Sequence, residues 1–155
     1  MAGYAPMRVA NLFRSEWAFE NEREGFRARA TRVGDAIGGS QIGAGLYELD
    51  DGQQMWPYHF HHGVEEWLLV LDGEPTVRTP GGERRLRRGD LLCFPSGAEG
   101  AHAVIGPGRM VLFSSVAANS IVVYPDSDKI GPRPADDADR LNFRRSDAVD
   151  YWEGE

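Results

Sequence analysis

Short apolar runs separated by turn residues recur along most of this chain, and they limit its fold more than any other feature. From residue 42 onward a run recurs about every 8–12 residues, with Gly, Pro or Asp between neighbours. The runs cover residues 42–49, 56–61, 66–71, 76–79, 83–87, 91–94, 101–105, 110–115 and 121–124. No long stretch shows the 3.6-residue periodicity of an amphipathic helix. The pattern therefore predicts an all-β domain, either a sandwich or a barrel.

The residues before this series are expected to lie over its surface. Residues 1–24 contain two apolar islands and are interpreted as an N-terminal arm or a short helix. Residues 26–30 alternate in polarity, which is typical of an edge strand. The glycine-rich stretch 34–45 is expected to be a loop. Residues 1–41 are thus predicted to form an arm with edge strands.

The residues after the series are expected to pack on the barrel, which we place at residues 42–125. Charges and prolines make residues 126–139 a predicted loop. Phe143 and the aromatic pair Tyr151-Trp152 suggest that the C-terminus returns to the body. Residues 126–155 are therefore expected to be a C-terminal extension of the same single domain.

Charge and cysteine content exclude several classes of function. The chain of 155 residues carries 17 basic and 24 acidic side chains, a net charge of −7. Nucleic acid and anionic membranes are both disfavoured as partners, because each attracts a positive surface. The single cysteine, Cys93, allows no internal disulfide and no cysteine-based zinc site, and we expect it to be buried. No signal-peptide core appears in residues 1–10, so a cytoplasmic protein is expected.

The run at 67–71 is apolar on both faces, which is unusual for a strand with one side in water. Such a strand is expected to be covered on both sides. The cover is either a partner sheet together with the N-terminal arm, or a second subunit. The sequence therefore predicts a homodimer as one of two explanations.

Three of the four histidines lie within four residues, and two glutamates follow them. His59 and His61 share a face if they lie on a strand, because alternate residues point the same way. A short turn after His62 can fold the next strand beside the first and bring Glu66 to the imidazoles, with Glu65 pointing away. His102 would have to arrive from a neighbouring strand. Neutral imidazoles and a carboxylate together are typical ligands of a divalent metal.

These residues resemble two motifs of the cupin family. The first motif reads Gly52, His59-Phe60-His61, Glu66 and Gly73, and the second reads Gly89, Pro95-Ser96-Gly97 and His102. The chain departs from the usual spacing in two loops: one residue is added before His59 and two are added before His102. Gly106 also stands where an Asn is usual. The stretch 123–127 further resembles a bacterial group of small single-domain cupins.

The resemblance implies a double-stranded β-helix, or jelly roll, with a metal inside the barrel. Carried over residue by residue, the metal ligands are His59, His61, Glu66 and His102. This donor set suits one divalent transition metal, namely Fe, Mn, Ni, Co or Zn. One or two open positions on such a metal can take water, oxygen or a chelating substrate.

The expected function is a metal-dependent enzyme acting on a small organic molecule, either dioxygenase-like or isomerase/lyase-like. The alternative is a barrel that binds a small sugar or organic acid without turnover. His62 and Tyr58 are weak candidates for a catalytic acid or base. Arg78 is a weak candidate for holding a substrate carboxylate. The motifs do not distinguish these reactions, because the fold and ligand set do not fix the chemistry.

Overall fold

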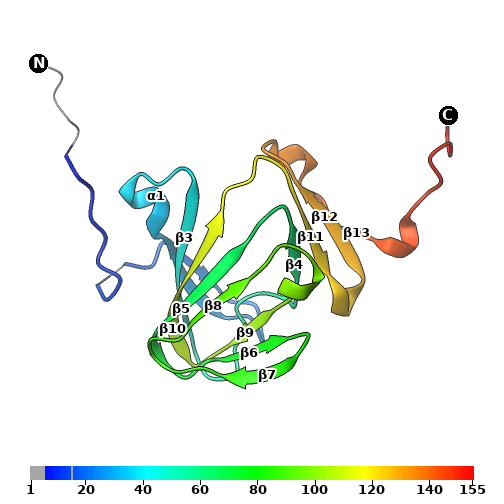
Figure 1. The fold of residues 1–155 in the computed structure, drawn as a ribbon. Coiled ribbons are helices and arrows are strands. Elements are labelled where there is room, and N and C mark those ends of the chain that lie inside the picture. The colour runs from blue at the N-terminus through cyan, green and yellow to red at the C-terminus, as the bar shows by residue number, and fades with distance from the viewer. Residues whose placement is uncertain (1–5, 15) are drawn as a thin grey trace, which may run out of the picture.

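The computed structural model describes residues 6–14 and 16–155, and strands make up most of its regular structure (Figure 1). The strands are β1 (Phe19–Asn21), β2 (Ala28–Arg32), β3 (Ile42–Leu49), β4 (Phe60–His62), β5 (Glu66–Gly73), β6 (Thr76–Thr79), β7 (Gly82–Arg85), β8 (Leu91–Phe94), β9 (Ala103–Ile105), β10 (Gly108–Ser115), β11 (Ser120–Tyr124), β12 (Lys129–Arg133) and β13 (Phe143–Arg144). The described residues also form a short helix, α1 (Val33–Ile37), and 3-10 turns at Ala98–Gly100, Pro125–Ser127, Asp137–Asp139 and Arg145–Asp147.

The described strands join into three antiparallel sheets. Their orders are β1-β2-β3-β10-β5-β8, β13-β12-β11-β4 and β7-β6-β9. Isolated pairings of Gln54 with Ile105 and of His59 with His102 connect the two smaller sheets along their neighbouring edges. The all-β jelly-roll prediction is confirmed, although the sheets enclose the core without closing into one continuous barrel.

The main core lies between the six-stranded and the three-stranded sheet. Along β5, Leu68 and Val70 are buried whereas Trp67 between them is 44% exposed. The inward residues pack with Val77 of β6, and each such burial contributes about 1.5–3 kcal/mol. Glu66 belongs to the same inward row of β5, since side chains alternate along a strand. The strand that builds the core therefore also carries a carboxylate into it.

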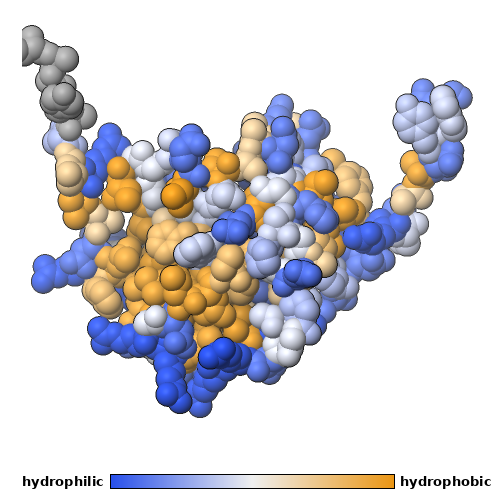
Figure 2. Space-filling model, viewed as in Figure 1, coloured by the Kyte–Doolittle hydropathy of each residue, from blue (hydrophilic) through white to orange (hydrophobic). Residues whose placement is uncertain are grey.

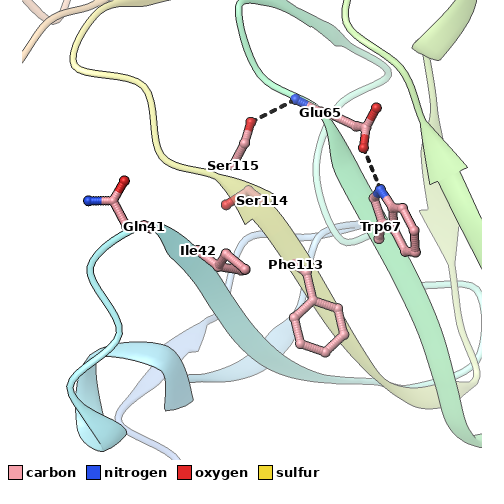
Figure 3. A pocket seen from close by; sticks show the side chains of 7 residues that line it. All are labelled: Gln41, Ile42, Glu65, Trp67, Phe113, Ser114 and Ser115. Atoms are coloured by element: carbon pink, nitrogen blue, oxygen red, sulfur yellow. Dashed lines mark hydrogen bonds between the residues drawn. The ribbon is translucent and has the colours of Figure 1, made fainter.

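The outer face of the six-stranded sheet is only partly covered. A second buried cluster there contains Val33, Leu46, Leu71 and Val111, with Trp17 of the N-terminal arm packed against it. Further along the face, Trp67, Ile42 and Phe113 line an apolar groove of about 350 Å³ (Figure 3). Figure 2 shows hydrophobic side chains gathered over the region of β10, β5 and β8. The arm thus covers the Leu71 end of β5 and leaves the Trp67 end open.

Three expectations for the first half of the chain need correction. The predicted edge strand at 26–30 is β2, which lies between β1 and β3. The expected loop at 34–45 contains most of α1 and the start of β3. The expected strand at 56–61 is regular only from Phe60, because, of the residues just before it, only Gln54 and His59 make pairings, and both are isolated. No helix of the described residues is long and apolar enough to cross a membrane.

The expected loop at 126–139 is also wrong, because it contains β12. Lys129 and Ile130 of β12 pair with β13, and Pro132 lies beyond that pairing. Pro132 lies opposite Ile121 of β11, but β13 does not extend to it on the other side, and prolines are tolerated at such edges of a sheet. The prolines and charges of this stretch are therefore the reason why the sequence pattern did not predict a strand.

The C-terminus and Cys93 differ from expectation as well. Tyr151 and Trp152 do not pack on the barrel: they are 83% and 72% exposed and contact each other, with ring centroids 4.8 Å apart. Cys93 is exposed, because it alternates with the buried Phe94 on β8 and pairs with Trp67 on the outer face. The apolar neighbours of Cys93 along the chain gave no sign of the face that it occupies.

The homodimer remains a prediction, and the open face around Trp67 is where it can be tested. Light scattering of a dimer through this face gives about twice the chain mass of 17.2 kDa. Trp67→Glu is expected to give the monomer mass, because a charge would be buried at the interface. The same change at Val149, which is 67% exposed on the C-terminal segment, is the control and leaves the dimer intact. A wild-type monomer at micromolar concentration would exclude this interface.

Candidate metal centre

His59 and His102 are brought together by backbone pairing of two segments that are far apart in the sequence. The His59 amide donates to the His102 carbonyl at 3.1 Å, and the His102 amide donates to the His59 carbonyl at 2.8 Å. Directly opposed residues of an antiparallel pair point their side chains to the same face. The two ring centroids are accordingly 4.8 Å apart. Phe94 stacks on the other side of His102 at 3.7 Å and fixes that ring.

His61 reaches the same place from β4, two residues after His59. The two rings are 5.0 Å apart and nearly perpendicular, at 89°. The turn at 95–97 is held against this strand, because the Gly97 amide donates to the His61 carbonyl at 2.7 Å. The Ser96 hydroxyl also accepts from the Gly63 amide at 2.8 Å. The turn that precedes His102 is thus fastened to the strand that carries His61.

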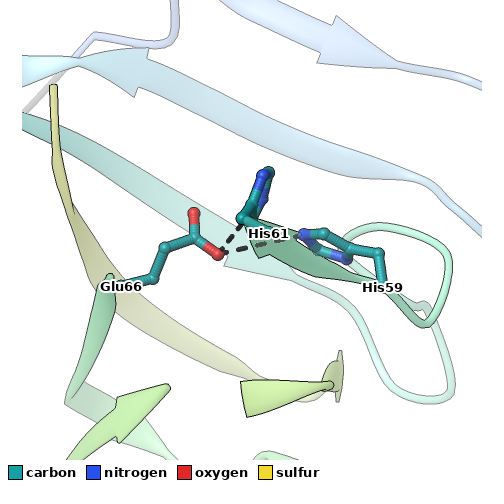
Figure 4. Close-up of side chains that lie close together, drawn as sticks. All are labelled: His59, His61 and Glu66. Carbon is teal, nitrogen blue, oxygen red and sulfur yellow. Dashed lines mark ion pairs between the residues drawn. The ribbon is translucent and has the colours of Figure 1, made fainter. Parts of the chain in front are cut away.

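Glu66 approaches the imidazoles from the opposite sheet. The expectation that β4 and β5 lie side by side is wrong, because β4 pairs with β11 while β5 pairs with β10 and β8. The Oε2 atom of Glu66 lies 3.5 Å from Nε2 of both His61 and His102. It lies 3.9 Å from Nε2 of His59. Figure 4 shows the carboxylate facing His59 and His61, whose ligand atoms and that of Glu66 lie within 4.8 Å of one another.

Backbone carbonyls orient two of the rings. Nδ1 of His59 is 2.8 Å from the Pro57 carbonyl, and Nδ1 of His102 is 2.8 Å from the Gly100 carbonyl. A carbonyl only accepts, so each Nδ1 carries the hydrogen and each Nε2 is left with a lone pair. Both lone pairs belong to the nitrogens nearest Glu66. This is the usual way in which a second contact prepares a histidine to bind a metal.

Burial disfavours the charged form of each of the four groups. It lowers the pKa of His61 to about 4 and of His102 to about 3, and it lowers the pKa of His59. It also raises the pKa of Glu66 to about 7. At neutral pH the imidazoles are therefore electron-pair donors. Glu66 Oε2 and His61 Nδ1 have no hydrogen-bond partner in the part of the chain that the structure describes.

A cavity of about 250 Å³ opens beside the cluster and is lined by His59, His61 and Glu66. Tyr47 of β3 lines it as well, and a Cβ atom on Gly45 would lie 2.8 Å from the Tyr47 hydroxyl oxygen. Gly45 therefore leaves room for the Tyr47 side chain. Burial and then the Glu66 carboxylate raise the pKa of Tyr47, so its hydroxyl stays protonated.

Of the four residues expected to bind metal, His59, His61 and Glu66 have ligand atoms within 4.8 Å of one another, and His102 joins them through Nε2, 3.5 Å from Glu66. The other three candidates lie elsewhere. His62 points away from the cluster and packs its ring on Phe60 at 5.3 Å. Tyr58 is buried, and the guanidinium of Arg78 covers its ring at 4.0 Å. Arg78 donates to both carboxylate oxygens of Asp126, at 2.6 and 2.9 Å. None of these three candidates lines the cavity.

Sequence reasoning missed several polar residues of the cavity, among them Tyr47, Ser114, Tyr124 and Arg133. The alternation of Gly45 and Tyr47 on one strand was a usable signal, because a glycine two residues from a tyrosine leaves space on the same face. Arg133 gave no signal, since its segment was expected to be a loop. Positions from β3, β10, β11 and β12 meet here only in three dimensions.

The pKa shifts predict how acid affects the metal-free protein. Below pH 6.5 the unfolded chain takes up protons on His61 and His102 that the folded chain refuses, so stability falls as the pH drops. Glu66 acts oppositely between pH 4.5 and 7, because the folded chain holds its proton there. The two histidines together change the free energy of unfolding more than the one glutamate does. Each proton difference changes it by about 1.4 kcal/mol per pH unit. Urea unfolding from pH 7 to 5 is expected to show this loss.

Glu66→Gln sharpens this test. The variant lacks the opposing proton, so its loss of stability between pH 7 and 5 is expected to be steeper by up to about 1.4 kcal/mol per pH unit. A variant with the same slope as the wild type, or a shallower one, would contradict the raised pKa of Glu66.

Comparison with known proteins places the fold. Residues 45–116 match the family model of the cupin domain. That span includes all four clustered residues. No curated protein sequence matches the chain.

Solved structures agree over nearly the whole chain. A protein proposed to be a sugar phosphate isomerase, from Acidithiobacillus ferrooxidans, is 23% identical with a TM-score of 0.76, covering 89% of this chain and 90% of its own. A cupin-superfamily sugar phosphate isomerase from Silicibacter pomeroyi is 22% identical with a TM-score of 0.78, covering 90% and 94%. A Cupin 2 conserved barrel domain protein from Salinispora arenicola is 21% identical with a TM-score of 0.56, covering 74% and 92%. Residues 45–116 thus match the cupin domain model, and the fold of the chain is similar to that of a cupin-superfamily structure.

Proposed function

We propose that this chain is a cupin and a metal-dependent enzyme acting on a small organic molecule, with one divalent transition metal held by His59, His61, Glu66 and His102. The observation that carries the proposal is the unpartnered Oε2 atom of Glu66. Three imidazole nitrogens lie 3.5–3.9 Å from it, and none of its contacts is a hydrogen bond.

The four groups are better suited to coordinate a metal than to form hydrogen bonds with one another. Two of the imidazoles use their only hydrogen on a backbone carbonyl, so neither can donate a hydrogen bond to an ionised Glu66 carboxylate. Buried polar groups without partners cost about 1–3 kcal/mol each, and a bound cation would satisfy them together. Three neutral nitrogens and one carboxylate suit Fe, Mn, Ni, Co or Zn. When bound, such a metal would supply Lewis-acid chemistry to an oxygen of the ligand.

The cavity supplies a second chemical group and a partly dry wall. The protonated hydroxyl of Tyr47 can donate a hydrogen bond or a proton to a bound oxygen. Leu112 and Val122 line the same cavity and keep part of its wall apolar. A volume of about 250 Å³ suits a small metabolite. Tyr47 thus takes the acid/base role for which His62 and Tyr58 were considered.

Isomerase- or lyase-type chemistry is the form of the proposal that we favour. Such reactions need a Lewis acid and a group that moves a proton, and Tyr47 provides the latter. Two structures with similar folds carry the name sugar phosphate isomerase, which supports this choice by analogy of fold. A dioxygenase-like reaction is the second form, because the same donor set also suits iron. A barrel that binds a sugar or organic acid without turnover is the alternative.

Metal retention tests the ligand set. After reconstitution and desalting, the wild type is expected to hold about one metal per chain by elemental analysis. His61→Ala is expected to lose it with an unchanged circular dichroism spectrum, since it removes one of four ligands from a partly exposed position. His62→Ala, one residue away and outside the cavity, is the matched control and should keep the metal. Stoichiometric metal in His61→Ala would refute the assignment.

The reaction class is tested by turnover of the metal-loaded protein. Sugar phosphates are followed by NMR for isomerisation, and small keto acids are followed by oxygen consumption. Tyr47→Phe is expected to retain the metal and to lower turnover about 10²- to 10⁴-fold, the usual worth of a positioned proton donor. Full activity in Tyr47→Phe would remove the residue from the mechanism. A ligand that binds and is recovered unchanged would favour the binding barrel.

A further inference from the structure

Arg133 lines the same cavity as the metal cluster, and its charge is held without a counter-ion. Nη1 donates to the carbonyls of Pro132 and Leu141 at 2.8 and 3.1 Å. Nη2 donates to the Tyr124 hydroxyl at 3.1 Å and to Oδ1 of Asn142 at 2.8 Å. All four acceptors are neutral. The guanidinium is therefore fixed in place while its positive charge stays uncompensated.

Several other arginines are neutralised by carboxylates. Arg78 pairs with Asp126 at 2.6 Å and Arg85 pairs with Glu74 at 2.6 Å. Among the described residues, no carboxylate lies within the 4.0 Å of an ion pair from Arg133. In a chain with a net charge of −7, a cavity-lining arginine with only neutral partners marks a local positive region.

The arrangement around Arg133 depends on a tight backbone. Gly131 lies two residues before Arg133 on β12, and a Cβ atom there would lie 2.2 Å from the Leu141 carbonyl oxygen and 2.8 Å from Nη1 of Arg133. Any other residue would displace one of these groups. The glycine thus allows the guanidinium to fold back over its own strand and to reach Leu141 and Asn142.

Tyr124 connects Arg133 to the histidines. Its hydroxyl accepts from Arg133 and keeps its own hydrogen to donate. Its ring lies 6.1 Å from the ring of His59, and Lys129 places its ammonium 5.0 Å from the Tyr124 ring centroid. Two cations and a free hydroxyl hydrogen therefore lie beside the candidate metal ligands.

We infer that Arg133 and Tyr124 form a subsite for an anionic oxygen group of the molecule that enters the cavity. The group is a phosphate or a carboxylate, since both are anions that the uncompensated charge of Arg133 attracts, and both offer an oxygen acceptor to the Tyr124 hydroxyl hydrogen. The inference rests on the proposed function and narrows its substrate to a small anionic metabolite, such as a sugar phosphate or an organic acid. It moves the anion-binding role from Arg78, already paired with Asp126, to Arg133.

Calorimetric titration with inorganic phosphate and, separately, with acetate tests the subsite in the metal-loaded protein. At least one anion is expected to bind the wild type, and Arg133→Gln is expected to weaken that binding about tenfold or more. Arg78→Gln is the matched control, because it removes an arginine outside the cavity, and should change the affinity less than about twofold. A preference for phosphate over acetate identifies the phosphate source of the anion, and the reverse identifies the carboxylate.

Three results would overturn the inference: no binding of either anion to the wild type, equal affinity in Arg133→Gln, or an equal loss in Arg78→Gln. Arg133 also anchors residues 141 and 142, so circular dichroism accompanies each variant. If Arg133→Gln does not fold, Tyr124→Phe decides. It removes one donor and should weaken binding severalfold, whereas unchanged affinity would count against the subsite.

Metal content, measured on the same samples, separates this inference from the proposed function. Metal in the wild type without anion binding would overturn the subsite and leave the metal site standing. Anion binding that depends on Arg133, in a protein that takes up no metal, would support the subsite and overturn the metal site. Titration of the His61→Ala variant shows whether the anion binds to Arg133 or to a metal. If His61→Ala still binds the anion, and the double variant with Arg133→Gln binds it more weakly, the result supports the subsite.

Discussion

The reciprocal backbone hydrogen bonds between His59 and His102 connect the fold to its site. They lie between β4 and β9 and so join the two smaller sheets at their edges. The same two bonds place the two side chains opposite each other on the inner face. A metal site made of distant segments needs such a fixed point, because free side chains would lose too much conformational freedom on binding. Here the sheet ladder has already restricted them.

The inner row of β5 carries an energetic conflict that the rest of the site resolves. Leu68 and Val70 bury this strand, and the burial carries Glu66 with it into a region of low polarity. Burial in this region raises the pKa of the carboxyl group to about 7, and three imidazole nitrogens face it without a hydrogen bond to its Oε2 atom among the described residues. A buried carboxylate that receives no hydrogen bond is poorly satisfied by protein alone. Burying Glu66 in this way costs free energy, and it occurs at a position where a cation could bind and next to a cavity.

The cavity beside the cluster divides into two chemical regions. The histidines and Glu66 form one region, and Tyr124 with Arg133 forms the other. The ring centroids of His59 and Tyr124 are 6.1 Å apart. Tyr47 adds a protonated hydroxyl from the opposite sheet. A ligand that spans such a cavity would meet electron-pair donors at one end and a positive charge at the other. This polarity favours a small molecule with a neutral oxygen function and an anionic group.

The sequence by itself determined the strand-rich fold and the identity of the clustered residues. The reason is local: turn residues separate the apolar runs, and the spacing of His59, His61 and Glu66 matches a motif whose parts lie close along the chain. Only the tertiary structure decided that Glu66 faces the imidazoles across two sheets, that Cys93 is exposed and that Arg133 enters the cavity. Strand partners are set by contacts between distant segments, and a shift of one residue exchanges the inner and outer faces. The local pattern of residues predicts neither the partner of a strand nor its register.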